Sequence, residues 1–150
     1  MLFSNLYVLL ESKSNKNIYF LSQNNMDNKT LSPRVPNNFL VKNGFEDSVT
    51  PRVCFAPSID KSLIALSRNL KGEKLYVHVP MENIDVYKPS IKEVPDSKVT
   101  GELWCKEKVK IKCIGMIEVI DATDDEYSYT YGTKYSAELY GWDWKWIKKY

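Results

Sequence analysis

The chain of 150 residues contains one histidine, and this scarcity excludes several kinds of catalytic site. One histidine cannot form a multi-histidine metal centre, and a Ser-His-Asp triad would have to be built around His78 itself. His78 lies in LYVHVP, on the opposite face of a predicted strand from Leu75, Val77 and Val79. We therefore expect His78 to face solvent or to pack against its neighbours.

Cysteines and the common catalytic motifs are also scarce. Cys54, Cys105 and Cys113 are odd in number and lack C-x-x-C spacing, which argues against a disulfide framework and against a zinc site. Cys54 and Cys113 lie in apolar runs, so we expect reduced, buried thiols. The sequence contains no P-loop, G-x-G-x-x-G, H-E-x-x-H or G-x-S-x-G motif. No bound metal is expected.

Excess charge and long apolar runs are absent as well. The net charge is only +2, so the whole chain is not drawn to nucleic acid or to an anionic membrane. The first residues, MLFSNLYVLLESK, have no basic region and no long apolar run, which argues against a signal peptide and a membrane span. We expect a cytoplasmic protein without membrane contact. Residues 2–10 are compatible with either a strand or a short helix.

The chain is rich in aromatic residues, with ten Tyr and four Trp. Its hydrophobic content of 43% and charged content of 27% are ordinary for a soluble globular protein. The length fits a single domain over residues 1–150. Ordered aromatic side chains fill cores, and they also form stacking or partner surfaces.

One helix is strongly indicated, over residues 58–70. Ile59, Leu63, Leu66 and Leu70 recur at helical spacing, and Ser58 is a suitable N-cap. Strands are predicted around this helix, at residues 17–22, 52–56, 74–79, 102–105 and 109–120, with a further short strand at 84–87. This order predicts an α+β fold of mostly antiparallel twisted sheets with one clear helix.

Three less regular segments accompany these elements. Residues 23–51 are dense in Asn, Pro, Asp and Gly, and long loops of this kind are typically lids or binding loops. The segment DATDDE, residues 121–126, is expected to be a solvated acidic turn. Gly115 indicates a β-bulge in the preceding strand, and the C-terminal tail after it is expected to form a last strand or helix.

The stretch TGELW places one acid, Glu102, beside Leu103 and Trp104 at the start of a strand pair. Two interpretations of Glu102 remain open. It is either a solvated residue at a sheet edge or an acid in a catalytic site.

The order of four segments resembles a known family. These segments are IYFLS, TLSPR, RVCFAPSIDKSLIAL and TGELWCKEKVKIKCIGMIEV. Their layout over residues 17–119 is similar to the ADP-ribosyltransferase-like fold, in the branch of DNA-targeting ADP-ribosyltransferase toxins and RNA 2′-phosphotransferases. Over more of its length the chain also resembles proteins of unknown function from low-GC Gram-positive bacteria and their phages.

The resemblance implies a site for NAD or an ADP-ribose-like nucleotide, with possible transfer of ADP-ribose to a macromolecule. Glu102 would be the catalytic carboxylate, and Arg34 or Arg52 would contact the pyrophosphate. Ser22 and Ser58 would bond the ribose. Stacking on nicotinamide or on a target base would come from aromatic side chains, namely Tyr19, Phe20, Phe55 and Tyr76. Phe20 stands where these families usually have His or Arg.

Two other functions remain as alternatives. The first is a non-catalytic protein-binding factor, phage-encoded or host regulatory and anti-defence-like, which would dock its partner through Trp142, Trp144 and Trp146. These alternate along the chain and would share one strand face, where they would equally serve as core cover. The second alternative is nucleic-acid binding through evenly spaced lysines, Lys106, Lys108, Lys110 and Lys112. Phe20 favours the non-catalytic factor, whereas Glu102 and Arg34 favour the nucleotide site.

Overall fold

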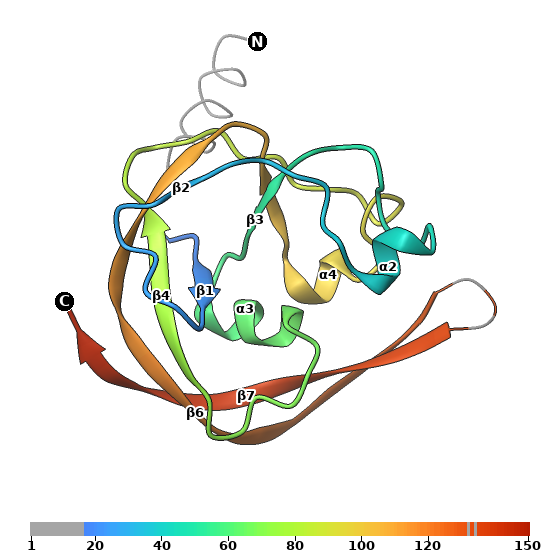
Figure 1. Cartoon of the computed structure of the whole chain (residues 1–150). Helices are drawn as coiled ribbons and strands as arrows, with labels where there is room; N and C mark the ends of the chain where they lie inside the picture. The colour runs from blue at the N-terminus through green and yellow to red at the C-terminus, as the bar shows by residue number, and fades with distance from the viewer. Residues whose placement is uncertain (1–16, 132, 134) are drawn as a thin grey trace, which may run out of the picture.

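The computed structural model describes residues 17–131, 133 and 135–150 (Figure 1). The prediction for residues 2–10 lies outside these ranges. The elements in chain order are β1 (Phe20–Ser22), β2 (Thr30–Leu31), α2 (Phe39–Lys42), β3 (Val53–Phe55), α3 (Ile59–Ala65), β4 (Lys74–Pro80), α4 (Ser97–Thr100), β5 (Leu103–Cys105), β6 (Val109–Tyr131) and β7 (Tyr135–Lys149). Antiparallel strands dominate and the helices are short, so the α+β class is confirmed at this coarse level.

The alternation of side chains along β6 builds the main sheet. Val109, Ile111 and Cys113 are buried, whereas Lys110 and Lys112 are exposed, as predicted. β4 pairs with β6, and β1 pairs with β4, all antiparallel. β2 and β7 pair with different stretches of β6. The lysine series is therefore only partly on a strand, because Lys106 and Lys108 precede β6.

A second sheet consists of β3 and β5, and single bridges connect it to its surroundings. Tyr19 bridges Ala56 beside β1, and Arg34 bridges Arg52 ahead of β3. The predicted short strand at 84–87 is wrong, since only Tyr87 forms a bridge, to Trp104. The strand predicted at 17–22 is shorter than expected and begins at Phe20.

Helix α3 begins as predicted but ends early. The Ser58 hydroxyl accepts a hydrogen bond from the Lys61 N–H at 3.0 Å, which is an N-cap interaction. The helix stops at Ala65, and Ser67 adopts a positive φ of 52°. Leu70 nevertheless packs into the same core cluster as Leu63, because the chain turns back toward the sheet. The apolar residues that recur at helical spacing therefore lie partly on a helix and partly on the turn that follows it.

The acidic segment 121–126 forms part of β6, so the predicted turn is wrong. Here the pairing with β7 is irregular, with register shifts between Val119 and Asp121 and between Ala122 and Glu126. The Thr123 hydroxyl bonds the Asp125 N–H at 3.2 Å, opposite Gly141, where a Cβ atom would lie 2.5 Å from that hydroxyl. The acidic side chains are exposed to solvent as predicted, but they lie on the long twisted ribbon that β6 forms with β7.

His78 is fully buried because the segment that follows β1 packs against it. The partner in β6 changes from Gly115 to Cys113 between Val77 and His78, and both of these residues have 0% exposure. The Met26 N–H donates to His78 Nε2 at 2.9 Å, so Nδ1 carries the proton that is donated to the Phe20 carbonyl at 3.1 Å. Burial lowers the pKa of His78. The packing alternative is correct, and the solvent-facing alternative is wrong.

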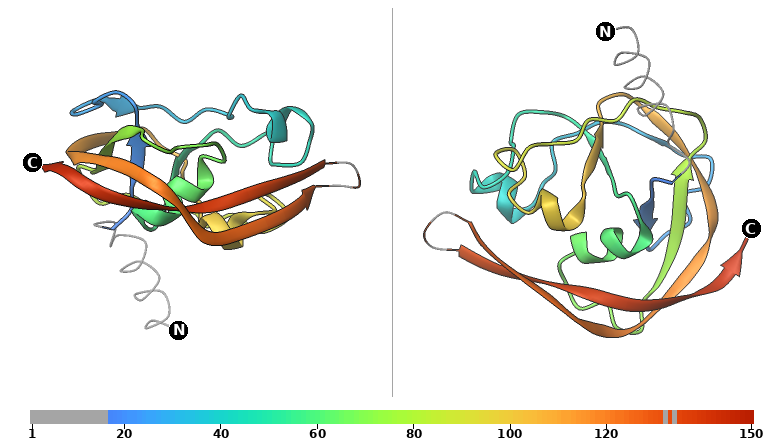
Figure 2. Two further views of the ribbon diagram at one scale, coloured as in Figure 1. Left: turned by 90° about the horizontal axis from the view of Figure 1, so that it is seen from below. Right: turned by 180° about the vertical axis from the view of Figure 1, so that it is seen from behind.

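The loop 23–51 forms a separate layer over the other elements. β6 and β7 form a curved ribbon below α3 and α4 in Figure 1. Figure 2 shows the segment between β1 and β3, which contains β2 and α2, crossing one face of the molecule. This segment therefore forms one wall of any space above α3. Within the described ranges, no helix is long and apolar enough to span a membrane.

We predict that Gly115→Ala destabilises the protein more than Gly44→Ala. Both glycines have positive φ, 153° and 75°, but a Cβ at Gly115 would lie 2.2 Å from the Lys148 carbonyl oxygen, whereas Gly44 faces open space. Gly44→Ala should cost about 1 kcal/mol, and Gly115→Ala more than about 2 kcal/mol. Urea unfolding of the two variants measures the difference, and equal losses would contradict the close β6–β7 contact.

Candidate functional site

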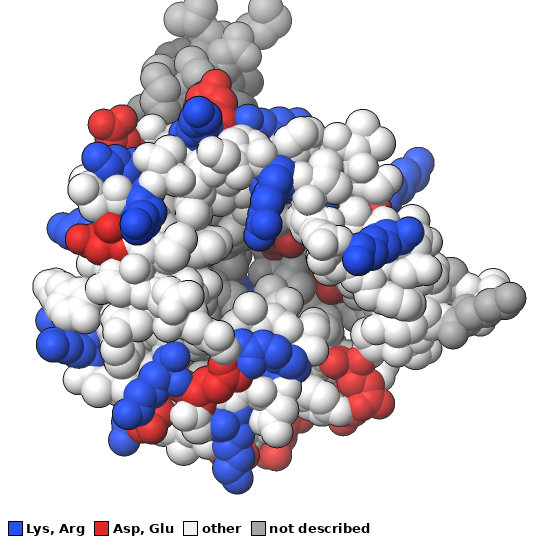
Figure 3. Space-filling model, viewed as in Figure 1, with Lys and Arg blue, Asp and Glu red and all other residues white. Residues whose placement is uncertain are grey.

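Three adjacent cavities that share lining residues form one groove between the loop 23–51 and the sheets. We name them the central cavity, of about 280 Å³, the acidic cavity, of about 530 Å³, and the arginine cavity, of about 630 Å³. Figure 3 shows a hollow in this face, with Asp or Glu atoms in its depth and Lys or Arg side chains at its rim. The volumes suit small-molecule ligands.

The central cavity brings together residues from five separate segments. Its lining consists of Tyr19, Phe20, Leu21, Pro36, Asn38, Glu46, Arg52, Cys54, Phe55, Ala56, Ser62, Ala65, Leu66, Thr100 and Glu102. Four of the predicted site residues, Tyr19, Arg52, Phe55 and Glu102, therefore line one space. They come from three of the four quoted segments, since Arg52 and Phe55 both belong to RVCFAPSIDKSLIAL.

Trp104 fixes the position of Glu102. Glu102 directly precedes β5, and the two side chains are two residues apart along an extended chain, so they lie on the same face. The fully buried Trp104 donates its Nε1–H to Glu102 Oε2 at 2.7 Å. Burial raises the pKa of Glu102, and the Trp104 bond and the Arg52 charge partly oppose this shift. Glu102 is thus an oriented, half-buried carboxyl group.

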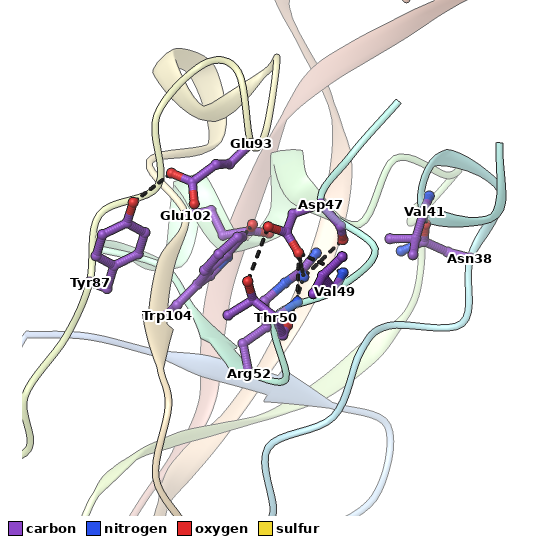
Figure 4. Close-up of polar contacts among 10 residues, drawn as sticks. All are labelled: Asn38, Val41, Asp47, Val49, Thr50, Arg52, Tyr87, Glu93, Glu102 and Trp104. Carbon is purple, nitrogen blue, oxygen red and sulfur yellow. Dashed lines mark hydrogen bonds and ion pairs between the residues drawn. The ribbon is translucent and has the colours of Figure 1, made fainter. Parts of the chain in front are cut away.

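Arg52 lies against the Trp104 ring and is 2% exposed. Its guanidinium carbon lies 4.2 Å from the centre of the Trp104 ring. Its Nη1 donates to the carbonyl oxygens of Asp47 and Thr50, each at 3.0 Å, and lies 3.4 Å from Asp47 Oδ1 (Figure 4). Trp104 therefore contacts both charged groups, Arg52 through its ring and Glu102 through its N–H.

Asp47 makes this anchor rigid. Its Oδ1 accepts the N–H groups of Val49 and Thr50, at 2.9 Å and 2.7 Å. The Thr50 N–H and the other bonds at this turn lower the pKa of Asp47, with Arg52 contributing. The turn 47–50 is thereby a fixed support for the Arg52 side chain.

The remaining edge of Arg52 is unpaired. Among the described residues, neither Nε nor Nη2 has a hydrogen-bond partner. The adjacent thiol is Cys54, which lines the same cavity. Burial, followed by the negative charge of Glu102, raises the pKa of Cys54 to about 12, although Arg52 opposes the shift. Cys54 is therefore a protonated thiol and not a reactive thiolate.

Three further acids line the acidic cavity with Glu102, and two of them, Glu46 and Asp96, have raised pKa values. Burial, followed by the charges of Glu102 and Asp96, raises the pKa of Glu46 to about 7. Burial also raises the pKa of Asp96, whose Oδ2 accepts the Tyr131 hydroxyl at 3.0 Å. Neighbouring acids resist simultaneous ionisation, so Glu46 is partly protonated at neutral pH.

The other predicted binding residues lie apart from the central cavity. Arg34 is exposed and lines the arginine cavity together with Arg52. Ser58 caps α3, and the Ser22 hydroxyl accepts the Asn24 N–H at 3.1 Å. Tyr76 lies on β4 and lines none of the three cavities. The roles implied for Ser22, Ser58 and Tyr76 have no geometric support.

The three tryptophans of β7 share one face, as expected, and they contact the core. Trp142 is 9% exposed and belongs to the cluster built around Leu63 and Leu75, against which Trp144 and Trp146 pack. Trp144 Nε1–H also donates to Asp60 Oδ1 on α3 at 2.8 Å. Core cover therefore accounts for their alternation along the strand.

Three residues of the groove were not predicted from the sequence, namely Glu46, Asp96 and Cys54. Glu46 lies in the irregular loop 23–51, which was expected to be functional as a whole, but no local pattern distinguishes it from the other acids. Asp96 lies directly before the four-residue helix α4. Within the described part of the chain, no group of three or more His, Cys, Asp and Glu side chains is arranged to hold a metal ion.

Searches of protein-family models, curated proteins and solved structures find no match to this chain.

We predict that Glu46→Gln stabilises the protein at pH 8 but not near pH 4.5. A carboxyl whose pKa is raised from 4.5 to about 7 binds more protons in the folded state, so stability falls as pH rises between those values. Above pH 7 the penalty of ionised Glu46 is at most about 3 kcal/mol, and the glutamine removes it.

Urea unfolding from pH 4.5 to 8 measures this difference between variant and wild type. The exposed Glu82→Gln is the matched control and should give a difference that does not vary with pH. Using differences removes the opposite contribution of His78, which disfavours the folded state at acidic pH. A pH-independent effect of Glu46→Gln would contradict the clustering of the three acids.

Proposed function

We propose that the groove binds NAD or an ADP-ribose-like nucleotide and that Glu102 serves ADP-ribosyl transfer to a macromolecule. The observation that carries this proposal is the convergence of Tyr19, Arg52, Phe55 and Glu102 on the central cavity. The resemblance to ADP-ribosyltransferase-like proteins implied roles for these four residues in one nucleotide site. Their shared cavity supports that assignment.

The geometry of Glu102 suits the chemistry of this reaction. Cleavage of the nicotinamide–ribose bond passes through a state with positive charge on the sugar, and a fixed carboxylate stabilises that charge. The Trp104 bond holds one oxygen, Oε2, and the Cys54 side chain also bonds the carboxyl group, so a ribose hydroxyl would use its remaining lone pairs. A preoriented group loses little entropy when the substrate arrives.

Arg52 compensates for the substitution of Phe20 in the first motif. Related families usually have His or Arg at that place, whereas here Phe20 and Arg52 line the same cavity from different strands. Phe20 forms an edge contact with Phe55, with ring centres 6.3 Å apart. The pair supplies an apolar, aromatic wall suited to a flat ring, while Arg52 supplies the cation.

The groove also has opposite charges at its two ends. Arg34 and Arg52 line the arginine cavity, and the described residues around it include no Asp or Glu. Glu46, Asp96, Glu102 and Glu138 line the acidic cavity, where the described lining includes no Lys or Arg. NAD carries an anionic diphosphate and a cationic nicotinamide ring, so this polarity complements its two ends.

We predict that Glu102→Gln abolishes NAD turnover while retaining ligand binding. The amide preserves size and hydrogen bonding but cannot offset positive charge on the ribose, so turnover should fall at least about 100-fold. Nicotinamide release reports turnover, and thermal shift with NAD and ADP-ribose reports binding.

Glu107→Gln is the matched control, because Glu107 is an exposed acid in the bend that follows β5. It should leave turnover unchanged. Equal turnover in Glu102→Gln and wild type would remove Glu102 from the mechanism. The absence of a thermal shift with NAD, ADP-ribose and ATP would overturn the nucleotide site.

We also predict that NAD turnover increases with pH. Glu102 acts as a carboxylate in this mechanism, and burial raises its pKa, so the active ionised fraction grows as pH rises above the ordinary range of glutamate. Initial rates at saturating NAD from pH 5 to 8.5 test this. Highest activity at the acidic end would instead indicate that a protonated group is required.

A further inference from the structure

His78 connects β4 to the chain on both sides of the β1 end, and it uses both ring nitrogens to do so. Nε2 accepts the Met26 N–H at 2.9 Å, and Nδ1 donates to the Phe20 carbonyl oxygen at 3.1 Å. The side chain is 0% exposed, so water does not replace either partner. Only the neutral imidazole with its proton on Nδ1 satisfies both bonds, because a protonated ring donates from both nitrogens.

The surroundings of the ring favour this neutral form. Burial lowers the pKa of His78, and the carbonyl bond from β1 and the negative charge of Asp27 only partly oppose the effect. Cys113 is the partner of His78 on β6, and burial raises the pKa of its thiol, which therefore stays neutral. Lys112, the residue before it, is exposed, and β1 (Phe20–Ser22) contributes no charged side chain. Asp27 is thus the one charged group that favours a protonated ring among these neighbours.

The segment 23–27 has little else to hold it against the sheet. Of its five side chains only that of Met26 is partly buried, and the rest are exposed. Asp27 Oδ1 accepts the Cys113 N–H at 2.8 Å. Residues 28–31, by contrast, are attached to β6 through backbone bonds and the β2 pairing. A short exposed segment held by a few hydrogen bonds opens at a low cost in free energy, while the attached residues after it stay in place.

Both partners of the ring also line the groove. Met26 and Phe20 line the arginine cavity, and Phe20 lines the central cavity as well. A change in the protonation of His78 therefore acts on a wall of the groove, although the ring itself lines neither cavity.

We propose that His78 is a pH-sensitive switch that holds residues 23–27 against β4 when neutral and releases them when protonated. A proton on Nε2 would place two N–H groups against each other, so the Met26 backbone moves away and the arginine cavity opens on that side. Residues 28–31 remain on β6 and form the fixed end of the moving segment. The inference goes beyond the proposed function, because it does not depend on which ligand the groove binds.

The direction of the pH dependence follows from the closed state. Its ring binds a proton less well than an exposed histidine does, whose pKa is 6.5. The equilibrium constant for release is therefore constant above that pH and rises below it, by at most about tenfold for each pH unit. Neutral and alkaline solutions keep the segment closed, and acid opens it.

The direct test follows the imidazole and amide signals of the ¹⁵N-labelled wild-type protein by NMR from pH 7.5 to 4.5. His78 is the single histidine of the chain, so its ring signals are identified at once. We expect a neutral ring with its proton on Nδ1 at pH 7.5. On acidification the ring should gain its proton, and the Met26 amide signal should move toward its unfolded position, with the same midpoint. The Trp104 amide, bonded to the Tyr87 carbonyl at 2.7 Å, is the internal control and should not move.

Two results would overturn the proposal. In the first, the ring is protonated while the Met26 amide keeps its position. In the second, the ring stays neutral until the Met26 and Trp104 amide signals are lost together, which would describe unfolding of the whole domain.

A pair of variants then tests the electrostatics of the switch. Asp27→Asn keeps the oxygen that accepts the Cys113 N–H but removes the charge that favours a protonated ring, so the common midpoint should move to lower pH. The matched control is Asp124→Asn, an exposed acid on the ribbon of β6 and β7, which should leave the midpoint unchanged. Equal midpoints in wild type and Asp27→Asn would contradict the proposed switch.

Discussion

The contact between the buried Arg52 guanidinium and the Trp104 ring is the constraint on which the groove depends. A charge removed from water is tolerated only where dipoles and aromatic faces replace its hydration, and here the Asp47 turn and the Trp104 face do so. The same indole donates its N–H to Glu102. One side chain thus sets the positions of a cation and a carboxyl group, and loss of the ring would release both.

The electrostatics of the groove follow from this arrangement. Arg52 lies between a cavity lined by a second arginine and a cavity lined by several acids. The acids raise one another's pKa beyond the effect of burial, as for Glu46 at about 7. Partial protonation of Glu46 reduces the negative charge of the acidic cavity at neutral pH, whereas Arg52 has two buried nitrogens without a partner among the described residues. A ligand of mixed charge would satisfy both ends together.

Particular residues show how far sequence reasoning extends. Ser58 was correctly placed at the start of α3, because capping depends on three neighbouring residues. The predicted end of the helix was wrong, since Leu70 reaches the core from the turn after α3. Its position in the sequence still matches the helical spacing. The acidic segment 121–126 was assigned to a turn because its composition is polar, but pairing with β7 keeps it extended. His78 was expected to be exposed or packed, and contacts with Phe20 and with Met26, 52 residues away in sequence, bury it.

The sequence by itself determined the alternation of β6, the cap of α3 and the scarcity of catalytic groups, because each depends on residue type or on neighbours along the chain. Only the tertiary structure decided which residues share the groove. Glu46 and Asp96 come from an irregular loop and a chain segment before α4, and no periodicity relates them to Glu102. Their raised pKa values and the unpaired edge of Arg52 arise from through-space distances and burial, which local sequence does not encode.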